Sequence, residues 1–119
     1  MIKESVLLVE DDSLLRDMLQ IFLEQLGYDV STAENAQKGL EQFMKKNCKI
    51  VITDINMPGK MNGIDVVRRI KAFKPTTRIF VCTGATDNLS TIENVAHQII
   101  RKPFDLGAIE KLLKNETLR

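Results

Sequence analysis

The chain has 119 residues, of which 44% are hydrophobic and 28% charged, and its 17 basic and 16 acidic residues leave a formal net charge of +1. This composition predicts one globular domain over residues 1–119, and the near-balanced charge argues against electrostatic binding of nucleic acid by the whole domain. The sequence has no stretch of transmembrane length and no signal-peptide pattern. Cys48 and Cys82 lie in apolar runs typical of buried thiols in a reducing compartment, so we expect the protein in the cytoplasm.

Short apolar runs alternate with segments of helical period along the chain. In chain order, this pattern predicts a strand at 5–10, a helix at 13–27, a strand at 28–33, a helix at 35–47, a strand at 49–54, a helix at 63–74, a strand at 78–83, a helix at 88–97, a strand at 98–100 and a helix at 105–115. Repeated strand–helix units with near-continuous apolar strands predict an α/β fold, a doubly wound parallel sheet with helices on both faces.

The residues at the helix ends agree with these boundaries. Ser13, Asn35 and Asp105 are predicted N-caps, and Gly27 is predicted to end the first helix. The apolar face predicted for that first helix consists of Leu14, Leu15, Met18, Ile21, Phe22 and Leu26.

Polar residues gather where the predicted strands end, which is where ligands bind in open parallel sheets. These residues are Glu10, Asp11 and Asp12 after the first strand, Asp54 after the third, Thr83 and Gly84 after the fourth, and Arg101 and Lys102 after the fifth. Converging carboxylates repel one another without a cation, and oxygen ligands of this kind suit Mg²⁺. A lysine and a hydroxyl beside a carboxylate suit a phosphoryl group in transfer. The pattern therefore predicts Asp54 as a nucleophile that accepts phosphate.

Four motifs, VLLVEDD, VITDINMP, VCTGA and IIRKPF, occur in this order, each at a predicted strand end. Together they resemble the receiver domain of bacterial two-component response regulators, of the chemotaxis-regulator type, over essentially the whole chain. The resemblance implies a flavodoxin-like five-stranded sheet in the order 2-1-3-4-5. It also implies a partner, a sensor histidine kinase or phosphotransfer protein, and an effector domain or protein downstream.

The same resemblance assigns roles to individual residues. Asp54 is the phosphoacceptor, and Glu10 and Asp11 bind Mg²⁺ with Asp54 and the main-chain carbonyl of Asn56. Thr83 and Lys102 contact the phosphoryl group, and the bond before Pro103 is expected to be cis. The family catalyses only its own phosphorylation and dephosphorylation, so we do not expect an enzyme with a separate substrate.

Three features depart from the family pattern. Two concern the region expected to respond to phosphorylation, and one concerns a loop. Ile99 stands where relatives usually carry an aromatic switch residue that moves with the threonine, and the stretch 83–102 is about one helical turn shorter than usual. The loop before Gly63 is one residue longer than the commonest form.

Several alternatives stay open on the sequence alone. Asp12 is either a helix cap or a further acid beside the pair. The chain is either a stand-alone receiver or the front end of a longer regulator. Its function could instead be that of a phosphohydrolase with an aspartyl-phosphate intermediate, or of a receiver-like binding module that is not phosphorylated.

Overall fold

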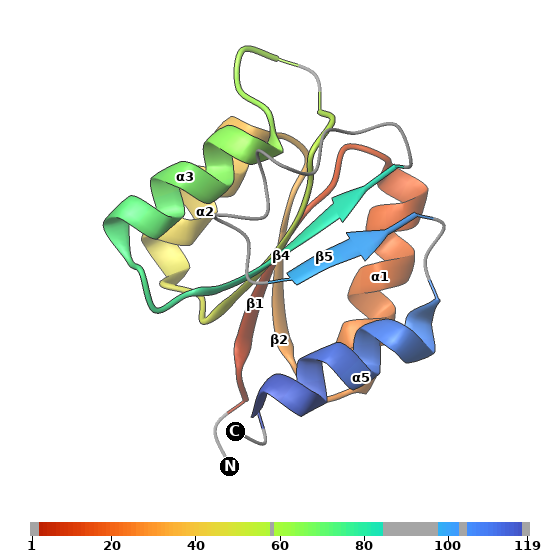
Figure 1. The fold of residues 1–119 in the computed structure, drawn as a ribbon. Helices are drawn as coiled ribbons and strands as arrows, with labels where there is room; N and C mark the ends of the chain where they lie inside the picture. Colours follow the sequence, from red (N-terminus) through yellow and green to blue (C-terminus); the bar gives the residue numbers. More distant parts are fainter. Residues whose placement is uncertain (1–2, 58, 85–97, 103–104, 118–119) are drawn as a thin grey trace.

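The computed structural model describes residues 3–57, 59–84, 98–102 and 105–117 of the chain (Figure 1). Its elements are β1 (Ser5–Val9), α1 (Ser13–Gln25), β2 (Asp29–Ala33), α2 (Ala36–Lys46), β3 (Ile50–Asp54), α3 (Gly63–Phe73), β4 (Arg78–Thr83), β5 (Gln98–Arg101) and α5 (Leu106–Thr117). The helix predicted at 88–97 and the cis bond predicted before Pro103 lie outside the described residues.

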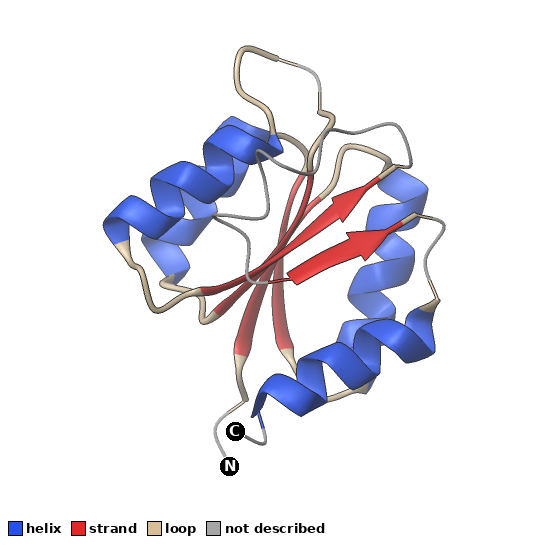
Figure 2. Cartoon of the chain, in the orientation of Figure 1, coloured by secondary structure: helices blue, strands red, loops and turns tan. Residues whose placement is uncertain are grey.

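The strands form one parallel sheet in the order β2-β1-β3-β4-β5, which confirms the predicted α/β fold and strand order (Figure 2). The registers place Val9 opposite Thr53 and Asp54 opposite Cys82. Because all strands run the same way, their carboxyl ends meet at one edge of the sheet. The central strands β1 and β3 therefore deliver their terminal residues side by side.

Alternate residues of each strand pack into two separate hydrophobic cores, one on each face of the sheet, because successive side chains of a strand point to opposite faces. On the face covered by α2 and α3, Leu7, Val9, Val51, Ile79 and Val81 pack among helix residues such as Phe43 and Ile70. On the face covered by α1 and α5, Val6, Leu8, Ile50, Ile52, Phe80 and Cys82 pack among Leu19, Leu23, Ile109 and Leu113. Figure 1 shows these two helix layers on either side of the sheet.

The helix caps agree with the sequence at three ends and differ at one. Asn35 caps α2, Asp105 accepts a hydrogen bond from the N–H of Gly107, and Gly27 follows α1 with a φ of +99°. The predicted N-cap Ser13 is wrong by one residue, since Asp12 caps α1 and Ser13 is its first helical residue. An Asp is as good a cap as a Ser, so position in the turn decides between them.

The buried face of α1 also differs from the predicted one. Its fully buried residues are Leu19 and Leu23, which the predicted set omitted. Three members of that set are largely exposed instead, namely Leu14 (79%), Met18 (47%) and Ile21 (57%). The helix carries apolar residues over two adjacent stripes, and the sheet covers only the stripe centred on Leu19 and Leu23.

Candidate functional site

Three carboxylates meet at the carboxyl edge of the sheet. Glu10, Asp11 and Asp54 each offer a carboxylate oxygen, and these oxygens lie within 4.8 Å of one another. Glu10 and Asp54 are only 3% and 6% exposed, whereas Asp11 is exposed. The cluster forms because β1 and β3 are neighbours in register, which brings their ends together.

Lys102 offsets part of the negative charge of this cluster. Its Nζ lies 2.8 Å from Oδ2 of Asp54 and 3.7 Å from Oε1 of Glu10. The main-chain N–H of Asn56 donates to Oδ1 of Asp54 at 3.3 Å. The two oxygens of Asp54 thus have different partners, which compensates the cost of holding a carboxylate almost out of water.

The start of α3 packs directly against the backbone that carries Asp54. The N–H of Gly63 donates to the carbonyl of Ile55 at 2.9 Å. A Cβ at position 63 would lie 1.9 Å from the main-chain oxygen of Asp54, so only glycine allows this approach. Asn62 and Asp65 complete a capping box at the same helix end. The start of α3 thereby supports the end of β3, where Asp54 lies.

The turn between β1 and α1 gives the three acids that follow β1 different hydrogen-bond partners. Asp12 accepts hydrogen bonds from the N–H groups of Leu14 and Leu15, so its side chain serves as the helix cap. The N–H of Asp12 in turn donates to Oε2 of Glu10 at 3.2 Å. Arg16 reaches back from α1 and donates through Nη1 to the carbonyl of Glu10 at 2.8 Å. These bonds leave Glu10 and Asp11 directed into the cluster.

The electrostatics of the site follow from burial and like charge. Burial raises the pKa of Glu10 to about 7, the nearby Asp54 and Asp11 carboxyls act in the same direction, and the N–H of Asp12 and the Lys102 ammonium oppose it. Burial alone would lower the pKa of Lys102, but its hydrogen bond to Asp54 and the charges of Asp54 and Glu10 outweigh burial and raise it. Three carboxylates against one ammonium leave negative charge to be neutralised. This donor set, entirely of oxygens, fits Mg²⁺.

The other predicted site residues stand as follows. Asn56 is exposed and follows β3 directly, and Ile99 is half-buried on β5 against the core beneath α2 and α3. Thr83 ends β4 beside Arg101 of β5, but its side chain, like Pro103, falls outside what the structure describes. Cys82 and Cys48 are buried free thiols, as predicted, and burial raises the pKa of each.

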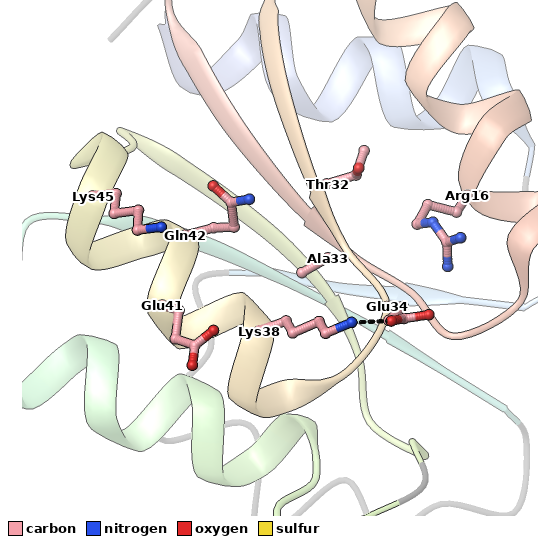
Figure 3. A pocket seen from close by; sticks show the side chains of 8 residues that line it. All are labelled: Arg16, Thr32, Ala33, Glu34, Lys38, Glu41, Gln42 and Lys45. Carbon is pink, nitrogen blue, oxygen red and sulfur yellow. Dashed lines mark hydrogen bonds and ion pairs between the residues drawn. The ribbon is translucent and has the colours of Figure 1, made fainter.

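A polar groove of about 350 Å³ opens between α1, the end of β2 and α2 (Figure 3). Its lining residues are Arg16, Thr32, Ala33, Glu34, Lys38, Glu41, Gln42 and Lys45. Lys38 pairs with Glu34 within it. The sequence does not predict this groove, because its lining residues form no motif and come together only in the fold. Within the described ranges, no helix combines the length and apolar character needed to cross a membrane.

Comparisons with known proteins agree with this architecture. The chain is 36% identical over 105 residues to a cyclic di-GMP phosphodiesterase of Thermotoga maritima, covering 86% of the chain and 28% of that protein. It is 32% identical over 117 residues to the transcriptional regulatory protein CrdR of Helicobacter pylori, covering 94% of the chain and 54% of that protein. The chain thus spans about half or less of the length of these curated relatives.

Solved structures and a family profile point the same way. The response regulator receiver domain protein of Clostridium thermocellum has a TM-score of 0.84 and 28% identity, with 97% of this chain and 98% of that one covered. The profile of the family described as the response regulator receiver domain matches residues 6–114. With this match over nearly the whole chain and the strand order of the fold, the chain belongs to the response regulator receiver domain family.

Proposed function

We propose that this chain accepts a phosphoryl group on Asp54 from the phosphohistidine of a sensor histidine kinase or phosphotransfer protein. The observation that carries the proposal is the pairing of a nearly buried Asp54 with Lys102 beside two further carboxylates. Asp54 is the nucleophile among them, because its second oxygen is already neutralised by the ammonium and it lies at the centre of the edge.

Each side chain of the cluster has a task in this transfer. Glu10, Asp11, Asp54 and the main-chain carbonyl of Asn56 would hold Mg²⁺, which supplies positive charge to the phosphoryl oxygens. An oxygen of Asp54 forms a bond to phosphorus as the phosphorus–nitrogen bond of the donor imidazole breaks, and the imidazole keeps the electron pair. Lys102 then pairs with the phosphoryl oxygens instead of the free carboxylate.

The phosphorylated state would change the surface near the edge. The acyl phosphate adds negative charge and acceptor oxygens, and Thr83 and Lys102 are the groups expected to move toward it. Attack of water on phosphorus regenerates Asp54 and releases phosphate. On this proposal the domain resets itself, acts on no separate substrate and passes its state to an effector domain or protein, with the cytoplasm as its expected location.

The experiment is intact mass spectrometry after incubation with a small-molecule phosphodonor, with and without Mg²⁺. We expect one added phosphoryl group that requires Mg²⁺ and is lost in Asp54→Asn. Asp12→Asn is the matched control, because it removes a neighbouring carboxylate but keeps a side chain that caps α1 equally well.

Other outcomes would favour the alternatives. Steady turnover of an aryl phosphate would indicate a phosphohydrolase. Absence of any adduct in the folded protein, with no binding of beryllofluoride, would indicate a binding module that is not phosphorylated.

A further inference from the structure

An apolar groove lies between α2 and α3, and none of the residues that line it belongs to the acidic cluster. It has a volume of about 230 Å³ and is lined by Leu40, Phe43, Met44, Arg69, Ile70 and Phe73. Met44 is 58% exposed and Phe73 61% exposed, although both are large apolar side chains. Adjacent exposed apolar side chains at a concave surface are typical of an interaction site.

Packing and a hydrogen bond stabilise the base of this groove and one of its ends. Phe43 is 1% exposed, and the Phe73 ring meets it edge to face, with centroids 6.4 Å apart and planes at 81°. At the carboxyl ends of the two helices, Nζ of Lys74 donates to Oδ1 of Asn47 at 2.7 Å. The exposed ring of Phe73 thus packs against a buried ring, and this contact restricts its side chain and reduces the entropic cost of binding.

The two helices that form this groove carry more basic than acidic residues. Lys38, Lys45 and Lys46 stand against Glu41 on α2, and Arg68, Arg69 and Lys71 stand against Asp65 on α3. Asp65 is bound in the capping box of α3. Glu41 and Lys45 of α2 both line the polar groove (Figure 3).

Arg69 is the charged residue that lines the apolar groove itself. It is exposed, and in the part of the chain that the structure describes it makes no ion pair. An acidic group beside the apolar notch would meet this guanidinium directly. The chain as a whole is nearly neutral, so the excess of basic residues on α2 and α3 is a local feature.

We propose that the groove between α2 and α3 binds an amphipathic helix of a partner protein. The partner helix places an apolar side chain between Met44 and Phe73 and a Glu or Asp against Arg69. A narrow notch between two helices accepts single side chains of a helix lying along it, as in helix-in-groove recognition. A lipid surface or a nucleic acid backbone would instead engage the cations and leave the notch unfilled.

The probe is a fluorescent helical peptide of about five turns, with Leu at helical spacing on one face and Glu on its borders. Two reference peptides carry Lys in place of Glu, or Ser in place of Leu. Binding is measured by fluorescence anisotropy, and the site by amide chemical-shift changes in the full chain. We expect the acidic peptide to bind and to shift residues of α2 and α3, and both reference peptides to bind at least about tenfold more weakly.

Three variants of exposed residues locate the contact. Phe73→Ala should lower the affinity for the acidic peptide by about tenfold or more. Arg69→Glu should lower the affinity for the acidic peptide and raise the affinity for the Lys peptide. Ile21→Ala, an exposed apolar position on α1, is the matched control and should change nothing. Because these side chains are exposed, the thermal midpoint of each variant is expected to stay close to that of the parent chain.

The proposal is overturned by any of three results. The acidic peptide could fail to shift α2 and α3, or it could bind as well to Arg69→Glu as to the parent chain. Alternatively, anionic vesicles or a DNA duplex could bind through Arg69 while the peptide does not, which would identify a polyanion surface instead. None of these results depends on phosphorylation of Asp54, so they are independent of the test of that function.

Discussion

Single residues at the carboxyl edge have tasks that their type alone does not reveal. Glu10, Asp11 and Asp12 are consecutive carboxylates, yet the structure uses Asp12 as a cap and turns Glu10 and Asp11 toward Asp54. The selection is made by hydrogen bonds of the turn, with Arg16 on the carbonyl of Glu10 and the N–H of Asp12 on its carboxylate. Neighbours in sequence therefore differ in role because a helix begins among them.

Gly63 supports the backbone of Asp54, and we expect Gly63→Ala to destabilise the fold by about 1–3 kcal/mol. The added methyl group would meet a main-chain oxygen, which cannot move aside as a flexible side chain can. Urea unfolding measures the effect. Gly107→Ala is the control, because that exposed glycine lies in the first turn of α5, where its Cβ would come no closer than 3.3 Å to a side-chain oxygen. Equal effects of the two substitutions would contradict the assigned close packing.

Glu10 should titrate unusually high in the metal-free protein. Its pKa rises from 4.5 to about 7 on folding, so the folded state binds the proton more tightly than the unfolded state. The stability that this proton contributes is complete below pH 4.5 and is lost as the pH rises to about 7. The thermal midpoint of the parent chain should therefore fall across this window relative to Glu10→Gln, and carbon-detected NMR of the Glu10 carboxyl reports its pKa directly. Titration near 4.5 would contradict the prediction.

At the scale of elements, α1 combines a buried stripe with an exposed apolar one. Leu19 and Leu23 pack under the sheet, whereas Leu14, Met18 and Ile21 face water on a helix that starts at the acidic edge. An exposed apolar stripe beside the proposed site of phosphoryl transfer suits the approach of a protein donor. The two stripes are neighbours on the helix, so sequence periodicity alone combined residues of both: Leu15 and Phe22 pack against the core, whereas Leu14, Met18 and Ile21 are exposed.

The exposed stripe leads to a prediction about the phosphodonor. The double variant Met18→Ala and Ile21→Ala should slow phosphorylation by a phosphorylated histidine phosphotransfer domain by about tenfold, since lost apolar contact weakens docking. Phosphorylation by a small-molecule donor should be unchanged, because the acidic cluster is untouched. The double variant Met44→Ala and Phe73→Ala on the opposite face controls for loss of exposed apolar surface. Slower reaction with both kinds of donor would indicate a damaged site instead.

At the scale of the molecule, the site joins parts that are distant in the chain. Glu10, Asp54 and Lys102 come from β1, β3 and the end of β5, and they meet only once the sheet has formed. A cation held by this cluster would bind the folded state and not the unfolded chain. Its binding free energy should therefore add to the free energy of unfolding.

We expect Mg²⁺ to raise the thermal midpoint of the chain. At a concentration about 100 times its dissociation constant, a ligand of the folded state adds about 2.7 kcal/mol to the free energy of unfolding. Differential scanning calorimetry with increasing Mg²⁺ measures this gain. Asp11→Asn should remove most of it and Asp12→Asn should leave it intact. A gain that survives in Asp11→Asn and disappears in Asp12→Asn would reverse the assignment of the two acids.

The sequence by itself determined the architecture and the place of the site. Near-continuous apolar strands separated by helical segments form a parallel sheet, and a parallel sheet gathers its strand ends at one edge, so Glu10, Asp11, Asp54 and Lys102 could be placed together beforehand. The roles assigned to these residues, to Asn56, and to Thr83, Ile99 and Pro103 in the readout, stay predictions.

Only the tertiary structure decided which residue caps the first helix, which of its apolar stripes is buried and which glycine makes a close backbone contact. Asp12 rather than Ser13 caps α1, the stripe of Leu19 rather than that of Leu14 is buried, and Gly63 touches the backbone of Asp54. Local spacing limits each choice to a few candidates of similar energy. The final selection depends on contacts between elements far apart in the chain, because a helix buries whichever stripe the sheet happens to cover.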